Sequence, residues 1–335
     1  MKTCIYGAGS LGTILGAYLA KSGFNADLIT RNKAHVEALN EKGAHVVGKV
    51  DFTVPVRAMV PDEMEDGYDV VFLMTKCLEN DATVRFISSH LSDKGIICTC
   101  QNGLPEPGIA EIIGEDRTYG CTIGWGATLK GPGVSELTSG EGTLSFSLGR
   151  IKGGTDDNLR MLQAILSRMG DAEIDEDFMA ARWSKLLINA SFSGLSAVTG
   201  YTFGGVIDDR KARHIAQNIM KECMDTAHKL GIKLAPMQGH DIEKILGYNG
   251  PVKKMISYHI IPVAMKKHRA LKASMLQDIE KGKPTEIDAI DGALSQQGRK
   301  AGIPTPCTDK TVEIVHMITE GSLKPSPDNL RLYSL

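Results

Sequence analysis

The first half of the chain alternates short apolar runs with segments of helical periodicity. The apolar runs predict strands at Lys2–Tyr6, Ala26–Thr30, Tyr68–Met74 and Gly95–Cys100, and shorter strands rich in Gly and Thr around 119–124, 133–137 and 143–148. Helices are predicted at Ser10–Ser22 and Lys33–Lys42, and each is followed by a glycine that stops it. This alternation predicts a mostly parallel sheet with helices on both faces.

The pattern changes near Asp156, and helical periodicity dominates from there on. Helical segments are predicted near 156–169, 178–198, 207–230, 255–281, 285–301 and 308–319, followed by an extended surface tail at 324–329. A chain of 335 residues also exceeds the usual size of one hydrophobic core. We therefore predict an α/β fold in which a Rossmann-type domain with a mostly parallel sheet at 1–170 is followed by an all-α domain at 177–335.

The composition excludes several classes of partner. Lys and Arg total 38 against 40 Asp and Glu, so the net charge of −2 gives no broad field for nucleic acid or an anionic membrane. No apolar stretch approaches the length of about 20 residues that a membrane span needs, and a strand at the N-terminus leaves no room for a signal peptide. The seven cysteines show no CxxC spacing and the nine histidines no HxxxH, which predicts reduced thiols, no metal site and a cytoplasmic location.

A glycine-rich turn follows the first predicted strand directly. Its GxGxxG pattern consists of Gly7, Ala8, Gly9, Ser10, Leu11 and Gly12. In such a turn the first glycine allows the tight bend, the second lets the backbone approach a pyrophosphate, and the third lets the helix pack on the strand. The helix N-terminus adds free N–H groups and the positive end of the helix dipole. The strand–turn–helix context therefore favours a dinucleotide site over a plain structural turn.

The end of the second predicted strand bears on the identity of the dinucleotide. An NAD site usually has an acid there that binds the ribose 2′-hydroxyl, whereas this chain has Thr30, Arg31, Asn32 and Lys33. Asp27 lies too early in the strand to reach the ribose. A guanidinium binds phosphate in a planar, bidentate fashion, so Arg31 favours NADP(H) over NAD(H). The alternative is an exposed loop arginine without a ligand.

Two further strand ends place polar residues where the topology puts the cofactor. Lys76 comes just after the strand that ends at Met74, and Asn102 just after the strand that ends at Cys100. The carboxyl ends of parallel strands form the edge of the sheet at which ligands bind. We therefore predict cofactor contacts for both residues. The alternatives are a solvated loop lysine and a turn residue ahead of Gly103.

A polar stripe marks one helix of the second half. Lys185, Asn189 and Ser193 recur every four residues in the predicted helix 178–198, so they share one face. A solvated face would usually be rich in Glu and Lys, whereas this one carries a single cation among small polar groups. The stripe therefore indicates the wall of a polar cavity, with a solvated face as the alternative.

Two other features have a plain structural explanation when they are taken alone. Thr285 and Asp288 resemble a capping box that starts a helix. Glu286 would then lie in the first turn, where the helix dipole favours an acid. Ser274 has no distinguishing context of its own. Neither Glu286 nor Ser274 would be assigned to a site on this basis.

Together, these motifs resemble the ketopantoate reductase family. The resemblance rests on the N-terminal GxGxxG, Asn102-Gly103, Trp183-x-Lys185-Leu186-x-x-Asn189, Ser274-Met275-Leu276-Gln277-Asp278 and Thr285-Glu286-Ile287-Asp288, and it covers both halves of the chain in the right order. It implies NADPH-dependent reduction of a 2-oxo acid to a D-2-hydroxy acid. The family reaction converts 2-dehydropantoate to (R)-pantoate, in pantothenate and coenzyme A biosynthesis.

The resemblance also implies roles for individual residues. Lys185 corresponds to the catalytic proton donor, and Glu286 to a catalytic acid that helps bind cofactor and substrate. Ala127, after Gly126, resembles a backbone contact to the cofactor. The substrate-binding positions are Asn102, which also contacts the nicotinamide, Lys185, Asn189, Ser193 and Ser274. Reductases of this kind commonly pair through the helical domain, so a homodimer is implied by analogy.

The chain departs from the family pattern at two positions. Ser193 stands where the pantoate-forming members have a second asparagine, and a third polar position falls near Phe203. Because serine lacks the reach and the amide of asparagine, recognition of one polar substituent should weaken. The alternative function is therefore a D-2-hydroxyacid dehydrogenase of the same family acting on another branched or aromatic 2-oxo acid.

The sequence leaves two alternative functions besides this activity. A β-hydroxyacid dehydrogenase also joins a Rossmann domain to a helix with a Lys-x-x-x-Asn pair, but the motifs from Ser274 to Asp288 speak against it. An NADP(H)-sensing protein that has lost its catalytic activity would keep the nucleotide site. The joint presence of Lys185, Asn189 and Glu286 argues against such a loss of activity.

Overall fold

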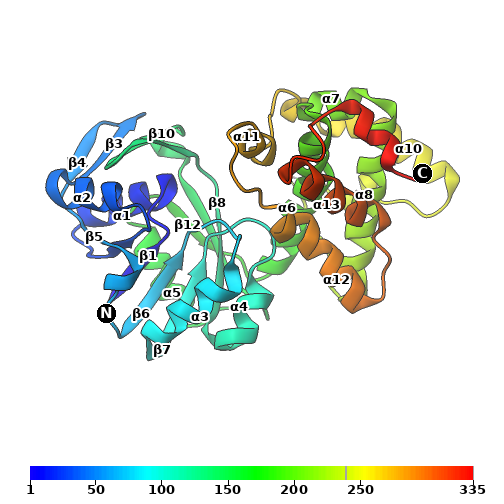
Figure 1. Cartoon of the computed structure of the whole chain (residues 1–335). Coiled ribbons are helices and arrows are strands. Elements are labelled where there is room, and N and C mark those ends of the chain that lie inside the picture. The colour runs from blue at the N-terminus through cyan, green and yellow to red at the C-terminus, as the bar shows by residue number, and fades with distance from the viewer. Residues whose placement is uncertain (238–239, 335) are drawn as a thin grey trace. The chain divides into compact units, whose positions relative to one another are not determined.

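A computed structural model describes residues 1–237 and 240–334 (Figure 1). The chain divides into two compact units, Met1–Phe178 and Met179–Leu335. The first combines strands and helices around a mostly parallel sheet, and the second is built from helices. The fold class is therefore the one that the sequence predicts.

The first unit is built on an eight-stranded sheet in the order β12-β11-β8-β7-β6-β1-β2-β5. All neighbouring strands are parallel except β8 and β11. The strands are β1 (Thr3–Tyr6), β2 (Asp27–Ile29), β5 (Arg57–Met59), β6 (Tyr68–Leu73), β7 (Leu91–Thr99), β8 (Thr118–Ile123), β11 (Ser145–Arg150) and β12 (Asp171–Ile174). Strands β1 and β6 are buried almost throughout, because both of their faces are covered.

Consecutive residues of the central strands face opposite layers of helices. Ile5 and Phe72 belong to one hydrophobic cluster, whereas Cys4 and Val71 belong to the other. The helices are α1 (Ser10–Lys21), α2 (Lys33–Lys42), α3 (Asn80–His90), α4 (Glu106–Ile113) and α5 (Asp157–Leu166). Helices α1, α2 and α5 contribute to the first cluster, and α3 and α4 to the second.

A second, four-stranded sheet in the same unit has the order β4-β3-β10-β9. Its strands are β3 (Ala44–Gly48), β4 (Phe52–Val54), β9 (Ala127–Gly131) and β10 (Val134–Leu137). Only β10 is predicted from the sequence. The parallel pairing of β3 with β10 joins segments far apart in the chain, which no local pattern reveals. Val46 and Leu137 attach this sheet to the core that α1 shares.

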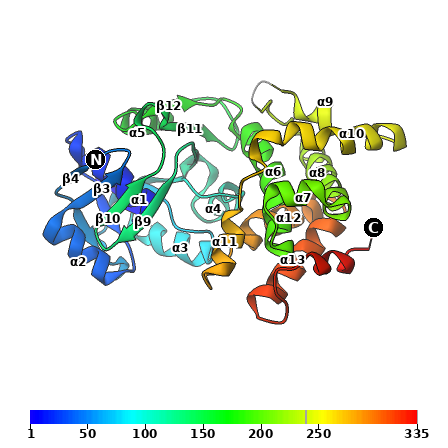
Figure 2. The same ribbon diagram turned by 90° about the horizontal axis from the view of Figure 1, so that it is seen from above.

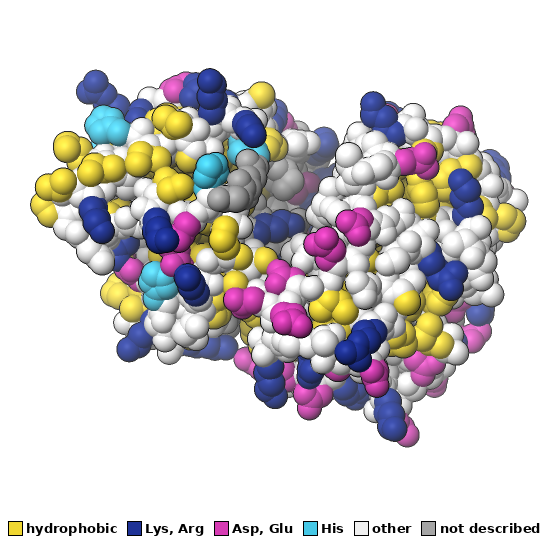
Figure 3. All heavy atoms as spheres, turned by 180° about the vertical axis from the view of Figure 1, so that it is seen from behind, with side chains coloured by type: hydrophobic (Ala, Val, Ile, Leu, Met, Phe, Trp, Pro, Cys, Tyr) yellow, Lys and Arg dark blue, Asp and Glu magenta, His cyan; other side chains and the backbone are white. Residues whose placement is uncertain are grey.

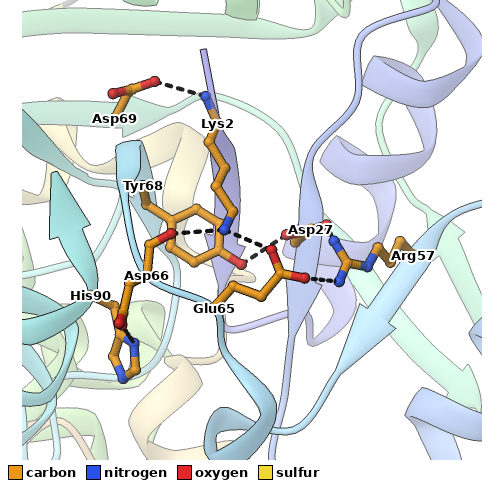
Figure 4. A network of polar contacts seen from close by, with 8 residues as sticks. All are labelled: Lys2, Asp27, Arg57, Glu65, Asp66, Tyr68, Asp69 and His90. Carbon is orange, nitrogen blue, oxygen red and sulfur yellow. Dashed lines mark hydrogen bonds and ion pairs between the residues drawn. The ribbon is translucent and has the colours of Figure 1, made fainter.

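A network of charged side chains joins the amino ends of four strands (Figure 4). The Lys2 ammonium lies 2.7 Å from a carboxylate oxygen of Glu65, which also pairs with Arg57. The Tyr68 hydroxyl donates a hydrogen bond to Asp27 at 2.7 Å. Asp27 is thus engaged at the amino end of β2, at the opposite end from the glycine turn, in agreement with the sequence-based placement.

Buried His35 connects α1, α2 and the turn between β9 and β10. Its Nδ1 accepts a hydrogen bond from the Gly133 N–H at 2.9 Å, so Nε2 carries the proton and donates to the Thr13 hydroxyl at 2.9 Å. Burial lowers the pKa of His35, which favours the neutral ring that this pattern requires. Thr13 lies in the first turns of α1, so this contact supports the helix that begins at the glycine turn.

The second unit consists of helices and connecting loops in its described residues. The helices are α6 (Phe178–Thr199), which begins at the last residue of the first unit, α7 (Phe203–Asp208), α8 (Arg210–Lys229), α9 (Ile242–Leu246), α10 (Pro251–Ala264), α11 (Ser274–Glu280), α12 (Ala293–Ala301) and α13 (Pro306–Thr319), with a π-helical turn at Asp288–Gly292. Figure 2 shows α6, α7 and α8 next to one another. Glu222 on α8 accepts hydrogen bonds from the N–H groups of Cys307 and Thr308, each at 2.9 Å, and so caps α13.

The predicted long helix at 255–281 and the predicted extended tail both differ in the structure. The helix predicted at 255–281 is divided into α10 and α11, because the Arg269 and Leu271 carbonyls accept hydrogen bonds from the start of α7. The tail is not simply extended. Pro327–Leu332 forms a 3-10 helix, and the buried Asn329 amide donates to the Val198 carbonyl at 3.0 Å.

Helix α10 exposes several hydrophobic side chains. Its exposed hydrophobic side chains are Val252, Met255, Ile256 and Val263. Figure 3 shows hydrophobic side chains at the surface of this unit among Lys and Arg side chains. The residues of α10 that face the core are Ser257 and Ile261.

Asp291, in the π-helical turn, is fully buried. A Cβ added at Gly194 of α6 would lie 2.8 Å from one of its carboxylate oxygens, so the carboxyl group rests against that helix. Neither oxygen has a hydrogen-bond partner in another residue of the described chain. Burial raises the pKa of Asp291 well above its ordinary value, and the nearby Glu222 carboxylate raises it further. The folded protein therefore favours the neutral form of Asp291.

Replacing Asp291 with Asn should remove a pH-dependent loss of stability. An aspartate in the unfolded chain ionises near a pKa of about 4, whereas the pKa of Asp291 is raised in the folded protein. Between these two pKa values the folded state holds a proton that the unfolded state has lost. Wild-type stability therefore falls as the pH rises, by at most about 1.4 kcal/mol per pH unit.

Thermal melting of the two proteins between about pH 5 and pH 8 measures this effect. The melting temperature of D291N should exceed that of the wild type by a margin that widens as the pH rises. Asp157→Asn, at a fully exposed position, is the matched control and should show a constant margin. Parallel curves for D291N and wild type would contradict the assignment of a neutral Asp291.

Candidate functional site

The glycine turn lies between β1 and α1 and contains two glycines that the fold itself requires. Gly7 has a φ of 109°, and a Cβ there would lie 2.5 Å from the Thr75 backbone nitrogen. A Cβ on Gly12 would collide with the Gly7 carbonyl oxygen. Gly9 differs, because no atom lies within 4 Å of the place where its Cβ would be. The space beside Gly9 is therefore open to a ligand, as the middle glycine of a dinucleotide turn requires.

The N-terminus of α1 is suited to an anion. The helix has no side-chain cap and no acid in its first turn. The turn is anchored to the end of β2, because the N–H groups of Gly7 and Ala8 both donate to the Ile29 carbonyl at 2.9 Å. Ser10, Leu11 and Gly12 then form the first turn, whose N–H groups are not used within the helix. The turn and the helix end therefore fit the pyrophosphate of a dinucleotide.

Arg31 follows β2 and is exposed. Its guanidinium lies 3.8 Å from the Glu79 carboxylate, at the position just ahead of α3. It also lies near the Tyr6 hydroxyl, whose pKa is raised by burial, an effect that the guanidinium partly offsets. The sequence predicts Arg31 as a phosphate ligand but carries no signal for Glu79, because the pairing joins loops that are distant in the chain.

The loops that carry Lys76 and Asn102 are joined at the carboxyl edge of the sheet. Gln101, which is buried, donates from its amide nitrogen to Asn80 at 2.8 Å and to Thr75 at 3.3 Å. Cys77 adds a longer contact, from its thiol to the Asn102 carbonyl at 3.7 Å. Lys76 and Asn102 are both exposed on these loops. Gln101 was not singled out from the sequence, although its place directly after a predicted strand is a signal that the sequence contains.

Ala127 begins β9 in the four-stranded sheet and is partly buried. The preceding residue is held by two hydrogen bonds, from the Gly126 N–H to the Ser139 hydroxyl at 3.0 Å and from the Thr138 N–H to the Gly126 carbonyl at 3.1 Å. The backbone at this position is therefore fixed, which suits the cofactor contact that the family resemblance implies.

The polar stripe of the second unit lies on α6. Lys185 and Asn189 are partly buried and Ser193 is buried, whereas the flanking Leu186 and Ala190 are wholly within the core. The side chains of the stripe are therefore more buried than those of a solvated helix face. This burial favours the interpretation of the stripe as a polar wall.

The remaining predicted residues lie at the starts of helices. Ser274 is the first residue of α11 and is exposed, and Glu286 is partly buried just ahead of the π-helical turn. Phe203 begins α7 and stacks on Phe192, with ring centroids 5.2 Å apart. The departure near this position therefore replaces a polar group with part of the core.

The structure does not contain the capping box that the sequence predicts at Thr285 and Asp288. The Asp288 carboxylate pairs with His316 of α13 at 2.9 Å, so it is directed toward another helix. The π-helical turn that begins there has no side-chain cap. The sequence motif at this point therefore fixes a helix–helix contact instead of a helix start.

The described residues show neither of two other kinds of site. Within 1–237 and 240–334, no group of three or more His, Cys, Asp and Glu side chains is placed to hold a metal ion. In the same part of the chain, no helix combines the length and the apolar character needed to cross a membrane.

The fold and these residues together define a class of enzyme. The first unit has a Rossmann-type sheet with a glycine cradle at its carboxyl edge, and the second carries an ammonium group beside an amide and a hydroxyl on one helix face. Dinucleotide-dependent oxidoreductases combine a site for the cofactor with polar groups that hold the substrate. The chain is an oxidoreductase of this class.

Comparison with known families identifies the family. Residues 3–150 match the model described as ketopantoate reductase PanE/ApbA, and residues 177–319 match the model for the C-terminal part of the same protein. The chain belongs to the ketopantoate reductase family, whose members act on CH–OH groups and use a nicotinamide dinucleotide.

Individual relatives are similar to this chain over almost its whole length. A 2-dehydropantoate 2-reductase of Mesorhizobium japonicum is 28% identical over 343 residues, covering 95% of this chain and 98% of the relative. One of Pyrococcus horikoshii is 28% identical over 310 residues, with coverage of 91% and 93%. The structure of D-mandelate dehydrogenase with NADH and anilino(oxo)acetate superposes with a TM-score of 0.78 at 24% identity, covering 96% of this chain and 99% of that one. At this identity the last similarity shows the fold alone.

Gly9→Ala should separate ligand binding from folding. The added methyl group meets no protein atom, so the melting temperature should stay within about 2 °C of the wild type. It would occupy the space left for the pyrophosphate, so affinity for a dinucleotide should fall at least about tenfold, the factor expected for losing one charge-assisted hydrogen bond.

The measurements are thermal melting and titration of the protein with NADPH followed by its fluorescence. Gly108→Ala in α4 is the matched control, because a Cβ there also meets no atom within 4 Å. It should leave both the melting temperature and the affinity unchanged. Equal affinities for the G9A and G108A variants would show that the dinucleotide does not bind at this turn.

Proposed function

We propose that the protein reduces a 2-oxo acid to a D-2-hydroxy acid with NADPH, with 2-dehydropantoate as substrate and (R)-pantoate as product. The observation that carries this proposal is the half-buried Lys185 on the same helix face as Asn189, in a chain whose other unit has a dinucleotide cradle. Membership of the ketopantoate reductase family supports it, as do the names of the relatives from Mesorhizobium japonicum and Pyrococcus horikoshii.

The residues of the first unit would bind the cofactor. The N-terminal turn of α1 would hold the pyrophosphate beside Gly9, and Arg31 would bind the 2′-phosphate of NADP(H). Lys76, Asn102 and Ala127 would contact the remainder of the nucleotide. When bound, the dinucleotide supplies the hydride that reduces the C2 carbonyl of the substrate.

The residues of the second unit would supply the acid and hold the substrate. The negative charge that develops on the carbonyl oxygen is stabilised by the Lys185 ammonium, which then donates its proton. Asn189 and Asn102 would orient the reacting groups, and Ser274 would bind the substrate carboxylate or hydroxyl. Glu286 would bind both substrate and cofactor. We also propose a homodimer, by analogy with the reductases that the chain resembles.

A second candidate is a D-2-hydroxyacid dehydrogenase for more apolar 2-oxo acids. Ser193 is buried, and Phe203 is stacked on the neighbouring Phe192, so this end of the stripe is less polar than the family pattern. An apolar surrounding would suit a branched or aromatic side chain better than the 4-hydroxyl of ketopantoate. The D-mandelate dehydrogenase with the same fold is consistent with this candidate.

A substrate panel tests the two candidates together. Purified protein with NADPH should oxidise the cofactor when ketopantoate is added, measured as loss of absorbance by the reduced nicotinamide. Turnover of branched or aromatic 2-oxo acids without turnover of ketopantoate would replace the first candidate with the second. Absence of oxidation with every acid in the panel would favour an NADP(H)-binding protein without catalysis.

Lys185→Ala should lower kcat by about 10² to 10⁴, the range expected for loss of a positioned acid. The dissociation constant of NADPH should change by less than about threefold, because Lys185 lies in the unit that does not carry the glycine turn. Steady-state kinetics and fluorescence titration measure the two quantities. Lys253→Ala, at an exposed position on α10, removes the same charge and should leave both unchanged. Near-normal kcat in K185A would reject Lys185 as the proton donor.

A further inference from the structure

We propose that Glu79 determines how strongly the protein distinguishes NADPH from NADH, by competing with the 2′-phosphate for Arg31. This inference deepens the proposed function and rests on it only in requiring a dinucleotide at the glycine turn. The residue was not predicted from the sequence, and it lies outside the motifs that carry the family resemblance.

The contact that carries the inference is an ion pair at the tip of β2. Arg31 Nη1 lies 3.8 Å from Glu79 Oε2, and the two side chains are 73% and 71% exposed. An exposed pair of this kind contributes about 0–1 kcal/mol to folding, so stability gives little reason for it. The same exposure leaves the guanidinium open to a ligand. Arg31 is thus engaged by a carboxylate at the position where a phosphate would have to bind.

The position of Glu79 is set by the loop that carries it. The loop between β6 and α3 is fastened by Gln101, which donates to Thr75 near its start and to Asn80 at its end. Glu79 precedes α3 directly, and its side chain does not cap that helix. These contacts hold the two ends of the loop at the edge of the sheet, where the Glu79 carboxylate lies 3.8 Å from Arg31.

Two acidic side chains near Arg31 oppose the binding of a phosphate dianion. Glu79 adds one negative charge next to the guanidinium, and Asp62, in the 3-10 turn Pro61–Glu63, lies near enough to the Tyr6 hydroxyl to raise its pKa. Lys33, at the start of α2, opposes them. A ribose 2′-hydroxyl has no charge and can donate a hydrogen bond to a carboxylate. The carboxylate of Glu79 therefore weakens binding of NADPH and narrows the preference for NADPH over NADH that Arg31 provides.

The test uses nucleotide fragments, so that its readout does not depend on turnover. Adenosine 2′,5′-bisphosphate carries the 2′-phosphate, and 5′-AMP lacks it. Their dissociation constants are measured by calorimetry for wild type, Glu79→Gln and Glu41→Gln. The last variant removes the same charge at the far end of α2 and is the matched control. Thermal melting accompanies each titration.

In Glu79→Gln the bisphosphate should bind more tightly by between about twofold and about fivefold, the upper value being the factor for one unit charge about 4 Å from the guanidinium in water. The affinity for 5′-AMP should stay within about twofold and the melting temperature should not change. The ratio of kcat/KM for NADPH to that for NADH should rise in the same direction. E41Q should show none of these changes.

The possible failures are distinguishable. If E79Q and E41Q give the same affinity ratio as the wild type, Glu79 is not a specificity residue, and the proposed reduction of 2-oxo acids is untouched. If the ratio shifts as expected but no 2-oxo acid is reduced, this inference stands and the proposed function fails. If neither nucleotide binds to the wild type, both are wrong.

Discussion

The close approach of the glycine turn to the end of β6 is the constraint on which the site depends. A Cβ on Gly7 would lie 2.5 Å from the Thr75 nitrogen, and one on Gly12 would collide with the Gly7 carbonyl. Only glycines at these two positions let β1, α1 and β6 meet. Their meeting exposes the unused N–H groups of α1 beside Gly9, where no protein atom fills the space. The charged network at the opposite edge holds the same strands from their amino ends.

The elements that carry the proposed nucleotide site could be predicted because their signals are local. The GxGxxG pattern and the strand before it lie within a dozen residues, and the strand ends that carry Arg31, Lys76 and Asn102 follow from the apolar runs. What escaped prediction is non-local. The pair of Arg31 with Glu79, the Gln101 link and the pairing of β3 with β10 join segments that only the folded chain brings together.

The helical half shows more clearly which features hydrophobic periodicity cannot predict. The stripe of Lys185, Asn189 and Ser193 follows from spacing alone, and its burial agrees with a polar wall. The division of 255–281 into two helices depends on carbonyls that bond to α7, which no periodic pattern contains. Likewise Asp288 matches a capping motif in sequence but binds His316 in the structure. In both cases a tertiary hydrogen bond overrode the local preference.

Transfer of hydrogen from the cofactor to the substrate tests the central claim most directly. The protein is incubated with ketopantoate, or with the 2-oxo acid that the substrate panel selects, and with NADPH deuterated on the transferred position of nicotinamide C4. Mass spectrometry of the 2-hydroxy acid should find one deuterium, bound to C2, and chiral chromatography should give the D enantiomer. A product without deuterium, or no product from any 2-oxo acid, would contradict the account.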